Sequence, residues 1–284
     1  MPLNYERIMA YRPADIAVSY GPRECMLYAL GIGLGMDPMD RRQLQFVYER
    51  ADLVAFPTLP TVLGWPGRLR GPEYGIDERL VVAASHKVVL NEPLPTEGRL
   101  TSHPRIKEVI DKGPGNAAIV QAIRELRALD GRVVATVENS MLARQHGGFG
   151  GKVTEVPPPH PVPSRPADTV CDLATPPNMA LVYRLTGDEN PLHADPERAK
   201  AAGFERPILH GAATFGVAAH AIIRQIDYQA DQLASFEARF VRPVFPGETI
   251  TTEIWRDGGR FLFRCRVAAR DQLVLTDGLA LLRS

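Results

Sequence analysis

Short segments rich in β-branched and aromatic residues alternate with turn residues over the last fifty positions of the chain. These segments are FEARFVRPV (236–244), TITTEIW (249–255), RFLFRCRVAA (260–269) and LVLTDGLALLR (273–283). Pro-Gly, Asp-Gly-Gly and Arg-Asp turns separate them. Strand-forming runs joined by such short turns predict an antiparallel meander.

A different pattern precedes the meander. The stretch GAATFGVAAHAIIRQ (211–225) is apolar on nearly all sides of a helical wheel, which predicts a helix buried in the interior. Its many small residues allow other backbone to approach closely. An antiparallel sheet wrapped around a buried helix is the hot-dog architecture, an α+β fold.

The two parts of the chain resemble each other at an offset of about 150 residues. LNEPLPTEGRLTSHPRI (90–106) is echoed by VRPVFPGETITTEIW (241–255), and the segment 115–144 is echoed by 259–284. The proline-rich stretch PPPHPVPSRP (157–166) has the composition of an extended linker. We therefore expect a double hot dog, with a buried helix in each repeat. The expected divisions are a first repeat (1–150), a linker (151–166) and a second repeat (167–284).

Composition narrows the possible functions. The chain has 284 residues, 45% of them hydrophobic, and a formal net charge of zero, so a sizeable core is possible and no basic surface suggests nucleic acid. No apolar run is long enough to predict a membrane span. The three cysteines show no disulfide or zinc spacing. We expect reduced thiols and a cytoplasmic protein, and 28 arginines against five lysines suggest a bacterial source.

The stretch GDENPLH (187–193) concentrates polar groups around a proline. Asp188 and His193 are five residues apart, so neither a helix nor a strand would bring their side chains together. Pro191 restricts its own backbone and that of Asn190, which predicts a rigid loop. Such a loop can direct a carboxylate, an amide and an imidazole at one water molecule. The alternative is that Asp188 and Asn190 only build a turn.

A helix start follows this loop. His210 and Gly211 lie where the buried helix begins, and the first backbone N–H groups of a helix have no internal partner and lie at its positive end. An oxygen that gains negative charge could bind there. Asp195 has a simpler explanation, since Asp-Pro-Glu (195–197) is typical of a helix cap. The loop and the helix start together suit addition of water to an enoyl thioester.

The first repeat has no equivalent loop. Its corresponding stretch, GIGLGMDPMDRRQLQ (31–45), contains Asp37 and Asp40 but no histidine, so we expect one active site per chain. The segments YRLTGDENPLH (183–193) and FERPILHGAATFG (204–216) resemble the signature of the 2-enoyl-CoA hydratase 2 group of MaoC-like dehydratases. The resemblance implies reversible hydration of trans-2-enoyl-CoA to (3R)-3-hydroxyacyl-CoA, without a metal or an organic cofactor.

The resemblance also implies roles for single residues. Asp188 and His193 would be the catalytic pair, Asn190 would bind the water, and the Gly211 amide would meet the thioester oxygen. Further residues implied are Lys112, His210 and Phe240 as contacts of the coenzyme A thioester, and Glu49, Arg184 and Pro191 as support of the loop, with Glu49 paired to Arg184. We expect a homodimer that binds acyl-CoA and neither nucleic acid nor membrane.

Three alternatives remain open at this point. A hot-dog acyl-CoA thioesterase would direct water at the carbonyl carbon, and a non-catalytic acyl-CoA-binding subunit would use no water. Asp188, His193 and His210 could also form a zinc site, although their spacing matches no zinc motif. The stretch AASHKVVLNEPLP (83–95) departs from related hydratases, which leaves the size of the acyl group open, up to a sterol side chain.

Overall fold

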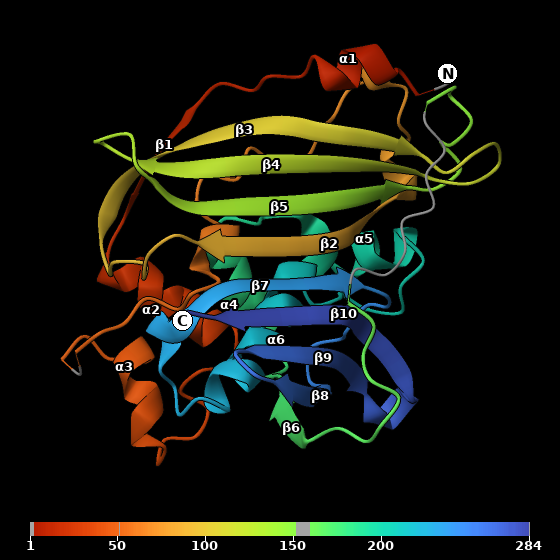
Figure 1. Cartoon of the computed structure of the whole chain (residues 1–284). Helices are drawn as coiled ribbons and strands as arrows, with labels where there is room; N and C mark the ends of the chain where they lie inside the picture. Colours follow the sequence, from red (N-terminus) through yellow and green to blue (C-terminus); the bar gives the residue numbers. More distant parts are fainter. Residues whose placement is uncertain (1–2, 51, 152–159, 284) are drawn as a thin grey trace.

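The computed structural model describes residues 3–50, 52–151 and 160–283, and a single antiparallel sheet dominates it. Ten strands follow one another in the order β1-β3-β4-β5-β2-β7-β10-β9-β8-β6 (Figure 1). The strands are β1 (Ile16–Tyr20), β2 (Val81–Leu90), β3 (Gly98–Asp111), β4 (Ala118–Ala128), β5 (Val133–Ala143), β6 (Thr169–Ala174), β7 (Leu233–Phe240), β8 (Thr249–Asp257), β9 (Arg260–Val267) and β10 (Gln272–Leu282).

The sheet consists of two five-stranded halves with the same internal order. Read outward from the middle, the first half runs β2-β5-β4-β3-β1 and the second runs β7-β10-β9-β8-β6. The halves join where β2 pairs with β7, with Val88 opposite Phe236 and His86 opposite Ala238. This repeated order confirms the double hot-dog architecture. The expected linker, 151–166, falls largely on residues 152–159, which lie outside the described part of the chain.

One long helix, α6 (Gly211–Arg224), lies behind the sheet, as the apolar pattern predicts (Figure 1). Every side chain from Ala213 to Ile223 is buried. The helix approaches the first half closely at Gly216, because a Cβ atom there would lie 2.4 Å from Cγ2 of Ile32. The remaining α-helices are α1 (Tyr5–Met9), α2 (Pro22–Gly31), α3 (Leu44–Val47), α4 (Met179–Tyr183) and α5 (Pro196–Ala201).

The first half lacks the long buried helix that was expected in each repeat. The corresponding segment, 56–64, contains only the 3-10 helix η2 (Leu59–Thr61). Pro57 and Pro60 explain this difference, because a proline inside a helix removes a hydrogen bond and clashes with the preceding turn. Gly64 then adopts a positive φ of 58°, which turns the chain away.

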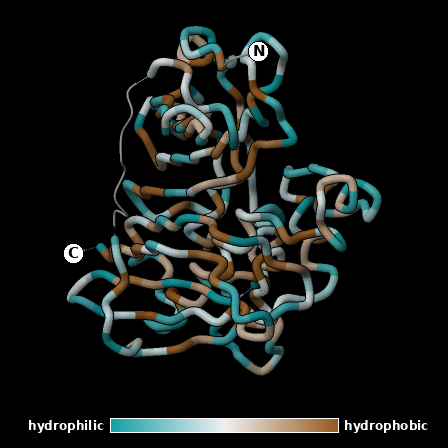
Figure 2. The backbone as a smooth tube through the Cα atoms, turned by 90° about the vertical axis from the view of Figure 1, so that its right-hand side faces the viewer, coloured by the Kyte–Doolittle hydropathy of each residue, from teal (hydrophilic) through white to brown (hydrophobic). Residues whose placement is uncertain are grey.

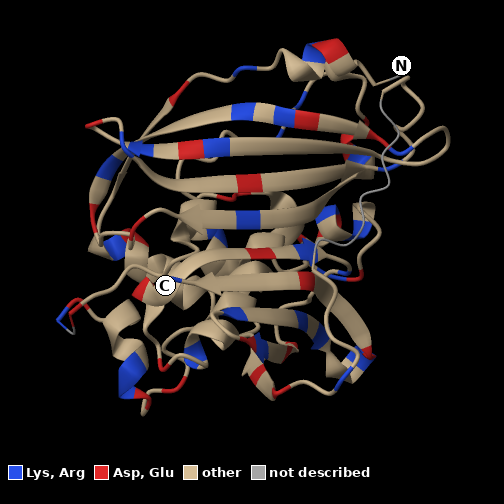
Figure 3. Cartoon of the chain, viewed as in Figure 1, with Lys and Arg blue, Asp and Glu red and all other residues tan. Residues whose placement is uncertain are grey.

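Charged residues occur at intervals on β2, β3, β4, β5, β7 and β10, between longer uncharged stretches (Figure 3). On the outer face, Lys107 of β3 reaches across β4 to Glu138 of β5 at 2.6 Å, and Lys87 of β2 pairs with Glu237 of the neighbouring strand β7 at 3.3 Å. In the perpendicular view, hydrophilic stretches gather in the outer loops (Figure 2). The opposite, inner face of the sheet packs against α6. Among the described residues, no helix has the length and apolar character needed to cross a membrane.

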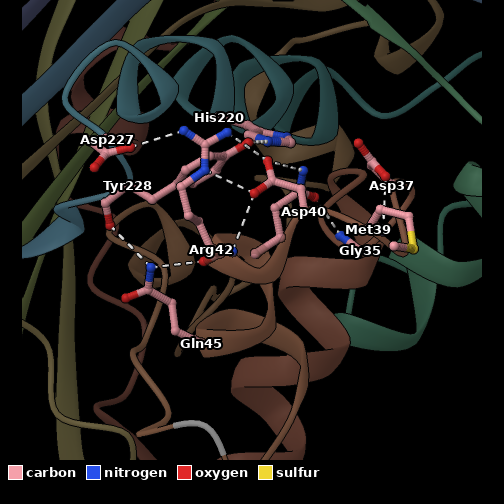
Figure 4. A network of polar contacts seen from close by, with 10 residues as sticks. Gly35, Asp37, Met39, Asp40, Arg42, Gln45, His220, Asp227 and Tyr228 are labelled. Carbon is pink, nitrogen blue, oxygen red and sulfur yellow. Dashed lines mark hydrogen bonds and ion pairs between the residues drawn. The ribbon is translucent and has the colours of Figure 1, made fainter.

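A polar network ties the two halves together at the C-terminal end of α6 (Figure 4). Arg42, from the first half, forms ion pairs with Asp40 at 2.8 Å and with Asp227 at 2.9 Å. Its guanidinium also lies 5.1 Å from the ring centre of Tyr228, whose hydroxyl lies 3.2 Å from Nε2 of the buried His220. These contacts hold the turn at Asp227 and Tyr228, where both residues have positive φ.

Candidate active site

The loop between α4 and α5 has the rigid geometry that its sequence predicts. Gly187 has a φ of 122°, a conformation that side chains rarely allow. Asn190 then caps the 3-10 helix η6 (Pro191–His193), and its Oδ1 accepts a hydrogen bond from the Leu192 amide at 3.2 Å. Oδ1 of Asp188 accepts from the Asn190 amide at 3.3 Å. Asp188 and Asn190 therefore do shape a turn.

The loop and the start of α6 bring three polar side chains into one cluster. Asp188, His193 and His210 each offer one atom, a carboxylate oxygen or a ring nitrogen, within 4.8 Å of the other two. The rings of His193 and His210 stack with their centres 3.7 Å apart. The turn and the chemical cluster are therefore the same structure.

Backbone carbonyls fix the tautomers of both imidazoles. His193 Nδ1 lies 2.9 Å from the Ile208 carbonyl oxygen, and His210 Nε2 lies 3.1 Å from the Asp188 carbonyl oxygen. A carbonyl oxygen can only accept, so each of these nitrogens donates. When each ring is neutral, His193 Nε2 and His210 Nδ1 are thus left with a lone pair. His210 also links the start of α6 to the backbone of this loop.

Burial keeps both rings neutral. Burial lowers the pKa of His193, and the Arg68 charge acts in the same direction, whereas the Ile208 hydrogen bond and Asp188 oppose it. Burial, followed by the His193 charge, lowers the pKa of His210 to about 3. A neutral imidazole with one fixed N–H can accept a proton from water at neutral pH.

Two buried polar atoms beside this cluster have no hydrogen-bond partner within the described chain. They are Nδ2 of Asn190 and Nδ1 of His210. Such atoms cost free energy unless another group satisfies them. An amide donor and an imidazole acceptor left without partners could each bind a small molecule such as water.

The start of α6 adjoins the cluster, because His210 is its N-cap and Gly211 its first residue. A Cβ atom on Gly211 would lie 3.3 Å from Cε1 of Phe240, so glycine keeps this approach open. The first amides of the helix can bind a developing negative charge. A proton acceptor and an anion site thus lie within the same few residues.

Known proteins match this chain over nearly its full length. Residues 157–276 match the family model of the MaoC-like domain, and residues 18–145 match that of the MFE-2 hydratase 2 N-terminal domain. Enoyl-CoA hydratase ChsH3 of Mycobacterium tuberculosis is 36% identical over 99% of both chains. The peroxisomal enoyl-CoA hydratase 2 of Arabidopsis thaliana is 34% identical over 96% of this chain and 93% of the relative.

The chain belongs to the MaoC-like dehydratases of the enoyl-CoA hydratase 2 type. It is an enzyme, a hydro-lyase. A crystal structure of a MaoC-like dehydratase from Phytophthora capsici matches with a TM-score of 0.87 at 30% identity, over 99% of this chain and 98% of that one. The likeness therefore includes both halves of the double hot dog.

His86 is a residue of this dehydratase that sequence reasoning missed. It comes from β2 of the first half, and its ring lies 5.2 Å from Phe240 and 5.6 Å from Phe215, both edge to face. Its Nδ1 is buried without a partner. Burial, followed by the Arg124 charge, lowers its pKa to about 4, and Asp188 opposes this. The departure in AASHKVVLNEPLP was the available signal, but only the β2–β7 pairing shows where His86 lies.

The predicted ion pair between Glu49 and Arg184 is wrong. Glu49 follows the end of α3 in a turn that faces solvent, and no ion pair of the described residues includes it with Arg184. Nε of Arg184 is buried without a hydrogen-bond partner. The pair was inferred from resemblance alone, and the surface position of the turn explains why it does not form.

The other predicted positions fall in two places. His210 belongs to the cluster, Pro191 lies in the loop beside it and Phe240 lies next to Gly211. Lys112 instead follows β3 in the β3–β4 turn, where its amide donates to the Ala117 carbonyl. Asp195 caps α5, as predicted, and its Oδ1 accepts from the Glu197 amide at 2.9 Å. The acid that caps a helix and the acid of the cluster are thus separate.

Asp188, His193 and His210 are also a group that could hold a metal ion. The ligands of a tetrahedral zinc ion point toward it from different directions. Here the two imidazoles lie face to face, with an angle of 29° between their planes. Two nearly parallel rings direct their nitrogen lone pairs along nearly parallel planes rather than at one point, which does not favour a tetrahedral zinc ion.

Proposed function

We propose that the chain hydrates trans-2-enoyl-CoA to (3R)-3-hydroxyacyl-CoA, and catalyses the reverse dehydration. The observation that carries the proposal is the cluster of Asp188 and neutral His193 beside the first turn of α6. The names of two relatives, enoyl-CoA hydratase ChsH3 and peroxisomal enoyl-CoA hydratase 2, agree with this substrate class. The assignment of the (3R) product rests on the family resemblance.

Four groups of the site take part in the proposed reaction: Asn190, Asp188, His193 and the Gly211 amide. Asn190 donates a hydrogen bond from Nδ2 to the water, and Asp188 and His193 take its proton as the oxygen attacks the β-carbon. Negative charge then develops on the thioester oxygen, where the Gly211 amide stabilises it. The proton returns to the α-carbon. These steps require neither a metal ion nor an organic cofactor.

We propose that the acyl chain extends into the first half. A narrow hollow there is lined mainly by apolar side chains, with Arg68 among its lining residues. The Arg68 charge acts on both His193 and His210, so the hollow begins close to the cluster. Its apolar lining residues are Leu69, Ile76, Val81, Val120, Met141 and Ala143. The hollow holds only about 20 Å³, so an acyl group would enter only as these side chains move apart. Lys112 would then contact the coenzyme A part.

The test is an assay with a panel of trans-2-enoyl-CoA substrates. The panel contains short, medium, long, 2-methyl-branched and sterol-linked acyl groups, and the loss of enoyl thioester absorbance measures turnover. Chiral analysis of the product gives the configuration at C3, expected to be R. A thiol reagent measures free coenzyme A in the same samples. Release of coenzyme A without a 3-hydroxyacyl product would contradict the proposal and indicate a thioesterase.

A further inference from the structure

Arg124 is a buried cation that the proposed chemistry does not use. It projects from the inner side of β4 in the first half and is 2% exposed, the only buried Lys or Arg side chain among the described residues. No carboxylate of the described chain forms an ion pair with it. Burial lowers its pKa to about 10. A buried charge without a counterion costs free energy, so hydrogen bonds to other groups must compensate for the lost contact with water.

The guanidinium binds the turn that replaces the missing helix. Its Nη2 donates to the Pro60 carbonyl at 3.0 Å and to the Thr61 carbonyl at 2.5 Å, and its Nε donates to the Leu63 carbonyl at 3.2 Å. One planar fork thus holds three carbonyl groups of η2 and the residues that follow. Arginine can do this because its donors are fixed in one plane, and lysine cannot.

Two tyrosines, Tyr28 and Tyr183, connect this turn with the second half. Tyr28 donates its hydroxyl hydrogen to Oγ1 of Thr58 at 2.8 Å and lies 3.5 Å from Oγ1 of Thr61. The ring of Tyr28 lies 5.9 Å from that of Tyr183, and both side chains are fully buried. Tyr28 and Tyr183 come from α2 and α4, so their packing is one of the contacts between the halves.

Tyr183 packs against His210, a member of the proposed catalytic cluster. Its ring lies 4.9 Å from that of His210, which stacks on His193 at 3.7 Å and donates to the Asp188 carbonyl at 3.1 Å. Tyr183 thus packs directly against His210, and through His210 it bears on His193. A small shift of η2 would move Tyr28 and Tyr183 and change the direction in which the imidazoles point.

We propose that Arg124 is a positioning residue for the hydratase reaction. It holds η2 in place, and through Tyr28 and Tyr183 it fixes the stack of His210 on His193 without touching the substrate. The first half then contributes to catalysis as well as to binding. This inference rests on the proposed function, because it concerns the turnover of the same site.

The test compares Arg124→Lys with Arg127→Lys in the full chain. Arg127 lies on the same strand but on the outer face, where it binds Glu125 and the Gly131 carbonyl. For Arg124→Lys, kcat should fall about 10- to 100-fold, since small misplacements of catalytic groups have effects of this size. KM should change less than about threefold, because no substrate contact is lost. Arg127→Lys should match the wild type in both constants.

A merely structural role would give a different result. In that case Arg124→Lys would lower the melting temperature, while the protein that remains folded would keep the wild-type kcat. That outcome would overturn the proposal, and so would a higher KM with unchanged kcat. If Arg124→Lys does not fold, Thr61→Val removes the next link, the hydroxyl near Tyr28, and the same loss of kcat is expected.

A second readout separates this inference from the proposed function. The imidazole nitrogen resonances of His193 and His210 can be followed by NMR in the absence of substrate. Arg124→Lys should shift both sets, and Arg127→Lys should shift neither. Unchanged resonances in folded Arg124→Lys would overturn the inference. A wild-type chain without hydratase activity would instead contradict the proposed function, and the resonances would still decide whether Arg124 positions the histidines.

Discussion

Gly216 of α6 packs closely against Ile32 of the first half, so one added methyl group there tests the packing between the halves. Replacing it by alanine puts a Cβ atom 2.4 Å from Cγ2 and 3.2 Å from Cβ of Ile32, whereas ordinary contacts begin at 3.4 Å. Ile32 must therefore move by about 1 Å inside a packed core, and overpacking this far below the 3.0 Å limit costs about 2–3 kcal/mol, the upper part of the usual range. Alanine favours the helix over glycine by about 1 kcal/mol. We expect a net destabilisation of about 1–2 kcal/mol.

Thermal unfolding followed by circular dichroism measures this effect. For a chain of this size the melting temperature should fall by about 2–6 °C. Gly259→Ala is the matched control, because a Cβ there would meet no atom within 4 Å. Gly216→Ala combined with Ile32→Ala should lose less than the sum of the two single changes, since the second relieves the clash. An unchanged or higher melting temperature for Gly216→Ala would refute the close packing of α6 against the first half.

Two further predictions concern pH and the loop. Burial lowers the pKa of His220 to about 4, so its stabilising effect should be complete above about pH 6.5 and lost as the pH falls toward 4, by up to about 3 kcal/mol. His220→Gln should therefore flatten the fall of melting temperature between pH 6.5 and 4, and an equally steep fall would contradict this assignment. Pro191→Ala should lower kcat by less than about tenfold, because it loosens the loop without removing a reacting group, and a loss as large as that of a catalytic residue would contradict this reading.

Much of the second half could be predicted from sequence because its signals are local. Turn residues divide the four strands of the meander, the apolar stretch 211–225 predicts the buried helix, and Asp-Pro-Glu at 195–197 predicts a cap. The rigid loop was readable for the same reason, since Pro191 restricts the backbone next to it. Each of these features depends on residues close together in the chain.

Long-range contacts could not be predicted in this way. His86 reaches the site only because β2 pairs with β7, and nothing near residue 86 indicates that pairing. Arg124 appears on an ordinary strand pattern, and its three carbonyl partners lie more than sixty residues earlier. The expected helix in the first half was a further error, although Pro57 and Pro60 argue against it once they are weighed. Similarity between repeats does not outweigh a local signal that breaks the helix.

The comparison of Asp188→Asn with Asp195→Asn tests the central claim most directly. Both changes replace a carboxylate by an amide of nearly the same shape, and the two residues lie seven positions apart. With an enoyl-CoA substrate, Asp188→Asn should lower kcat by about 10²- to 10⁴-fold, the usual effect of removing a positioned acid or base. KM should change little. Asp195→Asn should keep nearly full activity, because asparagine caps a helix as well as aspartate does. Full turnover by Asp188→Asn, with loss of turnover in Asp195→Asn, would contradict the account and place the chemistry on the other acid.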